Sequence, residues 1–110
     1  MTSSVIYLGD LRTEATHRAS KNNFITDAPL DNQGKGEAFS PTDTVATALA
    51  SCLLTIMGIK ARSLEIDLKG STAEVTKVMA SNPRRISEIR VIVNLSQRFD
   101  TKTQTLLERA

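Results

Sequence analysis

Cysteine and aromatic residues are scarce in this sequence, and their scarcity excludes several classes of protein. A single cysteine allows no disulfide within the chain and no metal site built from a cluster of thiolates. There is no tryptophan, one tyrosine and three phenylalanines, so side chains on which nucleic-acid bases could stack are few. The net charge of +2, from fourteen basic and twelve acidic residues, is too small to indicate a nucleic-acid partner. We therefore expect neither a nucleic acid nor a metal ion.

Long apolar runs and targeting signals are also missing from the pattern. No run approaches the roughly 20 apolar residues that a membrane-spanning helix requires. Residues 1–4 provide neither the basic start nor the long apolar core of a signal peptide. We therefore expect a soluble protein of the cytoplasm that makes no contact with a membrane.

The length of the chain limits the number of domains. A chain of 110 residues predicts one domain over residues 1–110 rather than two. An apolar share of 40% is enough for one hydrophobic core. A domain of this size buries only about two-thirds of the surface that its unfolded chain exposes. We therefore expect its stability to depend on association or on tight packing.

The first third of the chain favours extended structure. Three β-prone segments, broken by Gly9-Asp10 and by the Lys21-Asn22-Asn23 stretch, predict a strand meander. These segments are residues 5–8, 14–19 and 24–26. Residues 27–36 then gather most of the turn-forming residues of the chain into one long loop, and long loops in compact domains are often functional.

A helix start follows this loop. Ser40 is suited to the N-cap, Pro41 to the first helical position and Asp43 to the acidic third position of a capping box. Residues 45–59 are then almost wholly apolar or small. Apolar groups occupy nearly every direction around the axis, so we expect a central helix over residues 42–59 that is buried on most sides.

After Arg62 the hydrophobic period falls to two, which is typical of half-buried strands. We predict three strands here, the second with a bulge, over residues 64–69, 74–80 and 89–95. Asp100 is placed to cap a last short helix over residues 101–110. The switch from extended to helical to extended periods predicts the α+β class.

Cys52, in the middle of the apolar helix, has two interpretations. A lone cysteine among small residues is often a buried core residue. Alternatively it is a reactive thiolate, but the helix N-terminus is too distant to lower its pKa because that effect fades within one turn. A reactive Cys52 therefore requires a cation from elsewhere in the fold. Upstream candidates are Arg12, Arg18 and Lys35, and downstream candidates are Arg62, Arg84 and Arg85.

Other polar residues have structural interpretations of their own. Asp43 is accounted for locally as the acid of the capping box. His17 is the only histidine, so a Cys-His couple would have to use it, but a surface histidine on a strand is the simpler interpretation. The adjacent arginines Arg84 and Arg85 after Asn82-Pro83 are typical of a solvated corner.

The order of these elements, with Ser40-Pro41-Thr42-Asp43 nine to twelve residues ahead of Cys52, resembles the OsmC/Ohr family of thiol peroxidases. The resemblance covers essentially the whole chain. It implies an α+β fold in an intertwined homodimer, in which the meanders of both subunits join and the cysteine helices lie centrally. It implies no cofactor.

The resemblance also implies a catalytic set. Cys52 attacks the peroxide oxygen and becomes a sulfenic acid, while the acid in the helix-start motif orients an arginine that holds the thiolate. Asp43 matches one of the family's acidic positions, and Thr42 stands at the neighbouring one. We select Arg18 as the cation, with Arg12 and Lys35 as rivals.

The family carries a second cysteine, in a Cys-Pro motif, that resolves the sulfenic acid. The present sequence ends at Ala110, about where that motif would begin, so we expect a domain shortened at its C-terminus relative to the family, either as a fragment of a longer gene or as a shortened member. Its sulfenic acid would require an external dithiol reductant. The resemblance thus predicts a cysteine-dependent peroxidase acting on organic or fatty-acid hydroperoxides. A dimeric module that binds a hydrophobic ligand, or is catalytically inactive, is the alternative.

Overall fold

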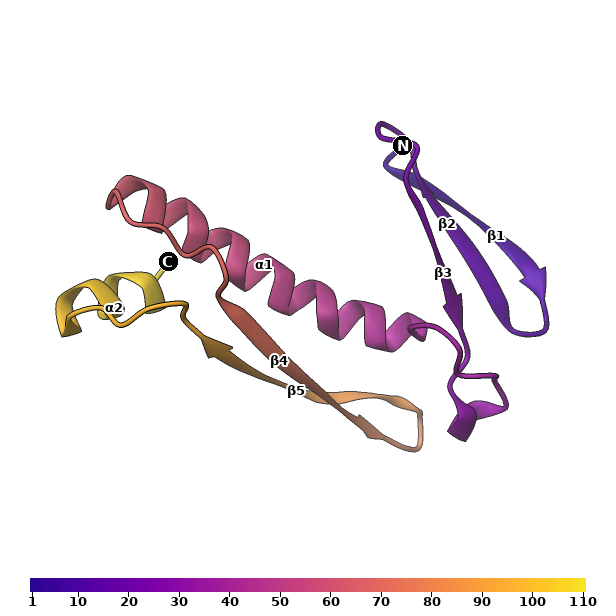
Figure 1. Cartoon of the computed structure of the whole chain (residues 1–110). Helices are drawn as coiled ribbons and strands as arrows, with labels where there is room; N and C mark the ends of the chain where they lie inside the picture. The colour runs from indigo at the N-terminus through magenta and orange to yellow at the C-terminus, as the bar shows by residue number, and fades with distance from the viewer. The chain divides into compact units, whose positions relative to one another are not determined.

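The computed structural model describes residues 1–110. Contacts within the chain divide it into two units, residues 1–45 and residues 46–110, and each unit is described by itself. Both contain regular structure, with three strands in the first and a long helix, a strand pair and a short helix in the second (Figure 1). The predicted α+β class is confirmed.

The first unit contains the predicted meander. Strands β1 (Ser3–Gly9), β2 (Arg12–His17) and β3 (Asn23–Asp27) form an antiparallel sheet in the order β1-β2-β3. The bounds of β2 differ from the expected residues 14–19. The strand begins at Arg12 and ends at His17, because Lys21 with a φ of 64° turns the chain back there and its backbone N–H donates to the His17 carbonyl at 2.9 Å. Arg12 therefore lies within the sheet and Arg18 outside it.

The loop after β3 is folded back on itself. It contains one turn of 3-10 helix, η1 (Leu30–Asn32), followed by Gln33 at a φ of 67°. A Cβ at Gly34 would collide with the carbonyl of Ala28, so this close approach requires glycine. The backbone N–H of Asp27 donates to the Phe39 carbonyl at 3.0 Å, which brings the end of the loop back beside the end of β3.

Helix α1 (Pro41–Ser63) begins with the predicted capping box. The Ser40 Oγ accepts from the Asp43 backbone N–H, and the Ser40 backbone N–H donates to the Asp43 Oδ2, both at 3.0 Å. The helix continues four residues beyond the expected end at Ile59. Lys60 and Arg62 lie in its last turn, where positive charge interacts favourably with the helix dipole.

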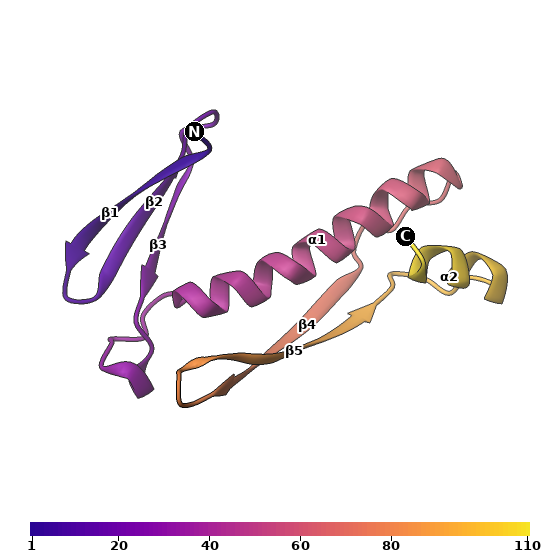
Figure 2. The same cartoon turned by 180° about the vertical axis from the view of Figure 1, so that it is seen from behind.

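The expected burial of this helix is wrong within one chain. Its buried residues are only Ala46, Ala50 and Ala61, whereas its large side chains Leu49, Leu53 and Ile56 are exposed. In both views the strand pair of the second unit lies on one side of α1 (Figure 1, Figure 2). Two strands cover one side of a helix, so a helix that is apolar all round keeps exposed apolar surface.

The expectation about membrane-spanning length also needs correction. An 18-residue window of α1 has a mean hydropathy of 1.6 and is 17% buried, so by length and composition the helix could cross a membrane. The threonines, serines and alanines between the larger apolar residues made this run look shorter in the sequence. A single helix of this kind is weak support for a membrane protein, because core helices of soluble proteins meet the same criteria.

The strand expected at residues 64–69 is not formed, which is a second correction. After α1 the chain turns, with Glu65 at a φ of 58° and the Ile66 backbone N–H donating to the Ala61 carbonyl at 3.0 Å. Leu64, Ile66 and Leu68 are half-buried while the residues between them are exposed. The alternation therefore records burial, and no neighbouring strand is present to pair with this segment.

The remaining predicted elements of the second unit are present. Strands β4 (Thr72–Ala80) and β5 (Arg85–Asn94) form an antiparallel pair, and the register shift between Val78 and Met79 confirms the bulge. Helix α2 (Thr101–Glu108) follows. The Asp100 Oδ1 accepts from the Thr103 backbone N–H at 2.7 Å, as a cap should.

Candidate functional site

Cys52 lies in the middle of α1 and is exposed. The interpretation of Cys52 as a buried core residue is therefore wrong within one chain. Leu49 and Ile56, three residues before and four after it, share its face of the helix and are exposed as well. We call Leu49, Cys52, Leu53 and Ile56 the thiol face. The only thiol of the protein is thus accessible and surrounded by apolar side chains.

The hydroxyl groups near Cys52 are bonded to the helix itself. The Ser51 Oγ donates to the Thr47 carbonyl at 3.1 Å, and the Thr55 Oγ1 donates to the Ser51 carbonyl at 2.8 Å. Hydroxyls that donate to backbone carbonyls in this way lie against their own helix. Any group that stabilises a thiolate at Cys52 must therefore come from outside this stretch of α1.

The strongest electrostatic feature of the first unit joins β2 to β3. The Arg12 Nε donates to the Asp27 Oδ1 at 2.7 Å, and the Arg12 Nη2 donates to the Asp27 Oδ2 at 2.8 Å. The Asp27 side chain is only 1% exposed and that of Arg12 is 31% exposed. The Glu37 backbone N–H also donates to the Asp27 Oδ2, at 3.2 Å, and the Glu37 Oε1 lies 3.7 Å from the Arg12 Nη2. We call Arg12, Asp27 and Glu37 the arginine clamp.

The contacts of the arginine clamp keep both partners charged. The hydrogen bond from Arg12 lowers the pKa of Asp27 below its ordinary value, with further lowering by the charge of Arg12, by the Glu37 backbone N–H and by the charge of Lys35, against the opposing effect of burial. The hydrogen bond to Asp27 raises the pKa of Arg12. Asp27 is therefore a carboxylate and Arg12 a guanidinium throughout the physiological range.

The other predicted cations of the first unit are held less firmly. Arg18 lies just after β2, is exposed, and its Nη1 lies 3.8 Å from the Met1 sulfur. Lys35 is exposed on the loop. Asp43, the predicted acid, lies in the first turn of α1 and forms the capping box. The clamp thus holds Arg12, whereas Arg18 and Lys35 are on the surface.

Two interpretations of polar residues as structural are confirmed. His17 is exposed at the end of β2, with its Nδ1 2.7 Å from the Ser20 Oγ. Arg85 lies at the corner between β4 and β5 and donates through Nη1 to the carbonyls of Ser81 and Pro83 at 2.8 and 2.9 Å. No group of three or more histidine, cysteine, aspartate or glutamate residues is arranged to hold a metal ion.

Sequence reasoning missed Asp27 and Glu37. Both lie in or beside a loop interpreted as turn chemistry, where acidic residues are common. The signal that could have found Asp27 is the strand register, because Arg12 and Asp27 are Cα partners across β2 and β3. Opposite charges placed directly across two strands interact, but the pairing appears only when β2 is started at Arg12.

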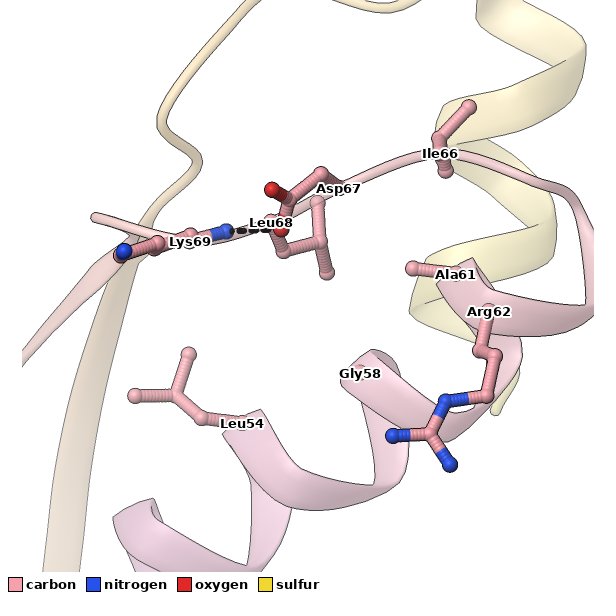
Figure 3. A pocket seen from close by; sticks show the side chains of 8 residues that line it. All are labelled: Leu54, Gly58, Ala61, Arg62, Ile66, Asp67, Leu68 and Lys69. Atoms are coloured by element: carbon pink, nitrogen blue, oxygen red, sulfur yellow. Dashed lines mark hydrogen bonds between the residues drawn. The ribbon is translucent and has the colours of Figure 1, made fainter.

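The second unit contains a pocket of about 370 Å³ beside the C-terminal part of α1. Figure 3 shows Leu54, Gly58 and Arg62 on the helix and Leu68 on the segment that follows it. Lys69 is held at its rim by a hydrogen bond from its backbone N–H to the Asp67 Oδ1 at 2.8 Å. Cys52 does not line this pocket, so the pocket is separate from the thiol.

The model of a family described as OsmC-like protein matches residues 34–110, which include Asp43 and Cys52. Among curated proteins no match was found.

Solved structures provide further matches. A candidate osmotic stress induced and detoxification response protein from Psychrobacter arcticus is 62% identical, with a TM-score of 0.96 over 99% of this chain and 80% of its own. A candidate organic hydroperoxide resistance protein from Vibrio cholerae is 15% identical, with a TM-score of 0.72 over 99% of this chain and 76% of its own. An organic hydroperoxide resistance protein OsmC from Legionella pneumophila is 14% identical, with a TM-score of 0.68 over 98% of this chain and 80% of its own.

Proposed function

The chain belongs to the OsmC-like family, and from this premise we propose that it is a redox protein that reduces organic hydroperoxides with the thiol of Cys52. The observation that carries the proposal is the accessible thiol on an apolar helix face. An apolar surround favours a hydroperoxide with a hydrocarbon chain, because burial of that chain is favourable. Two proteins of similar fold are described as organic hydroperoxide resistance proteins, which supports the same substrate class.

The proposed reaction is a two-electron oxidation of sulfur. The Cys52 thiolate attacks the terminal peroxide oxygen, an S–O bond forms and the O–O bond breaks. The departing alkoxide takes up a proton and leaves as the alcohol, while the transferred oxygen keeps the hydrogen it carried in the hydroperoxide, so the protein holds a sulfenic acid. An external dithiol then displaces water from the sulfenic acid to form a mixed disulfide. The second thiol of the reductant closes its own disulfide and releases the Cys52 thiol.

The thiolate requires a cation, and the contacts within the first unit favour Arg12 over the sequence-based choice, Arg18. Arg12 is held in one orientation by two hydrogen bonds to Asp27, whereas ordering a free arginine side chain costs up to about 2 kcal/mol. Arg18, with Asp43 orienting it, stays a prediction, and Lys35 is the third candidate. The cation comes from the same chain or from a second copy.

We propose that the second copy is part of the working protein. The thiol face carries Leu49, Leu53 and Ile56 in the open, and exposed apolar patches of this kind mark interaction sites. A symmetric homodimer is the commonest way for a soluble chain to cover such a face. We propose that a second copy of the chain, rather than a lipid bilayer, covers the thiol face, and that the protein is located in the cytoplasm. Sedimentation should give twice the chain mass at micromolar concentration, and a folded monomer would contradict the proposal.

The peroxidase proposal is tested by moving the thiol. Stopped-flow mixing with an alkyl hydroperoxide should oxidise the parent protein far faster than it oxidises free cysteine, and mass spectrometry should find one added oxygen on Cys52. Cys52→Ser should not react. The matched control carries Ser51→Cys together with Cys52→Ser, which shifts one exposed thiol about 100° around the same helix. It should react no faster than free cysteine. If the parent is no faster either, the chain is an inactive or ligand-binding module.

A further inference from the structure

The pocket beside the C-terminal part of α1 takes no part in the proposed reaction, because Cys52 does not line it. We propose that it is a binding site for a small amphipathic carboxylate, which is a hydrocarbon chain that ends in one negative charge. The residues that line the pocket lie between Leu54 and Lys69, within the second unit. The proposal does not depend on the reactivity of the thiol.

The interior of the pocket is apolar. Leu54 and Ala61 come from α1, and Ile66 and Leu68 come from the segment that follows the helix. In Figure 3 the Leu68 side chain extends from this segment toward α1. The volume of about 370 Å³ lies within the range of roughly 300–1,000 Å³ that is typical of small-molecule sites. This lining favours a hydrocarbon chain, because burial of the chain removes apolar surface from water.

Gly58 leaves the helix side of the pocket open. A Cβ at this position would meet no atom within 4 Å, and Gly58 is not among the residues with positive φ. Neither packing within the chain nor backbone conformation therefore requires glycine here. Glycine in the interior of a helix makes the helix less stable than alanine would. An occupant of the pocket would give this glycine a function that the chain alone does not.

Two basic residues and one acidic residue line the same pocket. Arg62 lies in the last turn of α1 and Lys69 on the segment after it, and neither side chain has an acidic partner within the chain. The Asp67 Oδ1 accepts from the Lys69 backbone N–H at 2.8 Å (Figure 3), which holds this carboxylate in its own turn. Two cations against one anion leave a net positive charge, which is complementary to a monoanion. A phosphate monoester carries a charge of about −1.5 to −2 at pH 7 and would exceed it.

The pocket and the thiol face lie on opposite sides of α1. Successive residues of an α-helix are about 100° apart around the axis, so Leu54 is about 200° from Cys52. Gly58 and Ala61, four and seven residues after Leu54, share its side of the helix. A second copy of the chain on the thiol face therefore does not compete directly with a ligand in the pocket.

The test uses octanoate, titrated into the isotope-labelled full chain and followed by the chemical shifts of the backbone amides. We expect saturable shifts at Leu54, Gly58 and Leu68, with a dissociation constant between about 10 μM and 1 mM for a ligand of about ten non-hydrogen atoms. Octanol has the same chain without the charge and should bind about fivefold more weakly. Acetate has the charge without the chain and should not saturate over the same range.

Variants assign the binding to the pocket. Gly58→Leu fills the space beside the helix and should abolish saturable binding. Arg62→Gln and Lys69→Gln should each weaken binding about fivefold, through the loss of one partly exposed charge. Lys60→Gln is the matched control, because it removes a cation from the same end of α1 that does not line the pocket, and it should bind like the parent. Cys52→Ser should also bind like the parent.

Several outcomes would overturn the proposal and leave the peroxidase proposal standing. They are the absence of saturable binding, shifts confined to the thiol face, equal affinities for octanoate and octanol, and equal weakening by Lys60→Gln and Lys69→Gln. If Gly58→Leu does not fold, which circular dichroism reports, the double variant of Arg62→Gln and Lys69→Gln takes its place. A loss of affinity of more than about tenfold then supports the proposal, and a smaller loss overturns it.

Discussion

The two units of the chain treat their polar and apolar groups in opposite ways. In the first unit the charged residues Arg12 and Asp27 are paired and held within the sheet. In the second unit the thiol face leaves Cys52 and large apolar residues exposed on α1. The charged pair of the meander is therefore formed within the first unit, whereas α1 carries apolar side chains that one chain leaves exposed. The charged pair is completed within the first unit, and the dimer that we propose would cover the apolar surroundings of the thiol.

The sharpest test of this contrast is Cys52→Ser. We expect complete loss of the reaction with an alkyl hydroperoxide in stopped flow, because no other thiol exists. The free energy of unfolding should change by no more than about 0.5 kcal/mol, as for other exposed positions, and denaturant unfolding measures it. A stability loss of several kcal/mol would instead mean that Cys52 is a packed core residue in the working assembly.

Ile56→Asp tests whether a second copy of the chain covers the exposed thiol face of α1. A charge placed in an apolar interface lacks a partner and costs several kcal/mol. We therefore expect the dissociation constant of the proposed dimer to rise about a hundredfold, measured by sedimentation over a concentration series. Leu30→Asp is the control, because Leu30 is more exposed, on the loop of the first unit. Dissociation by Leu30→Asp alone would place the interface elsewhere.

Substitutions of Asp43 test the first turn of α1, which follows the meander and its loop along the chain. Asp43→Ala should destabilise the protein by about 1 kcal/mol through loss of the capping box, visible as a lower midpoint in urea. The reaction with hydroperoxide should also slow if Asp43 orients the activating arginine. Asp43→Asn keeps an acceptor for the cap and removes the charge, so it separates the two effects. A normal rate in both variants would limit Asp43 to capping.

The smallest expected effect is the response to acid. Asp27 and Asp100 have lowered pKa values, from the Arg12 hydrogen bond and the Thr103 backbone N–H respectively. A lowered folded-state pKa adds stability above the ordinary carboxyl pKa of about 4, and this is lost as the pH falls through the folded value. We expect Asp27→Asn and Asp100→Asn to flatten the fall of melting temperature below pH 4. The other charged residues near Asp27 are Arg12, Lys35 and Glu37. Unchanged slopes in both variants would contradict this.

Much of the fold could be predicted because its signals are local. The cap formed by Ser40 and Asp43 and the cap at Asp100 depend on hydrogen bonds within four residues, and both are present. The meander depends on turns between short β-prone segments. The segment at residues 64–69 failed the same reasoning, because alternation reports burial and a strand also needs a neighbour to pair with.

The candidate site likewise contains residues that the sequence identifies and residues that only the structure shows. Cys52 was found because it is the only thiol and because the motif ahead of it is local in the sequence. Asp27 was missed because its partner, Arg12, lies fifteen residues away along the chain. The two residues face each other only in the observed register of β2 and β3. The sequence analysis placed the second strand two residues too late, and Arg12 then fell outside it. The choice among Arg12, Arg18 and Lys35 depended on contacts of the same long-range kind.

The sequence by itself determined the α+β class, the capped helix with its thiol and the family resemblance, since each depends on neighbouring residues and their spacing. Only the tertiary structure decided that Arg12 is paired with a buried Asp27, that residues 64–69 form no strand and that the thiol face is exposed. The physical reason is that strand register, ion pairing and burial depend on which distant segments meet. Local propensity and hydrophobic period specify what a segment can form and leave its partners open.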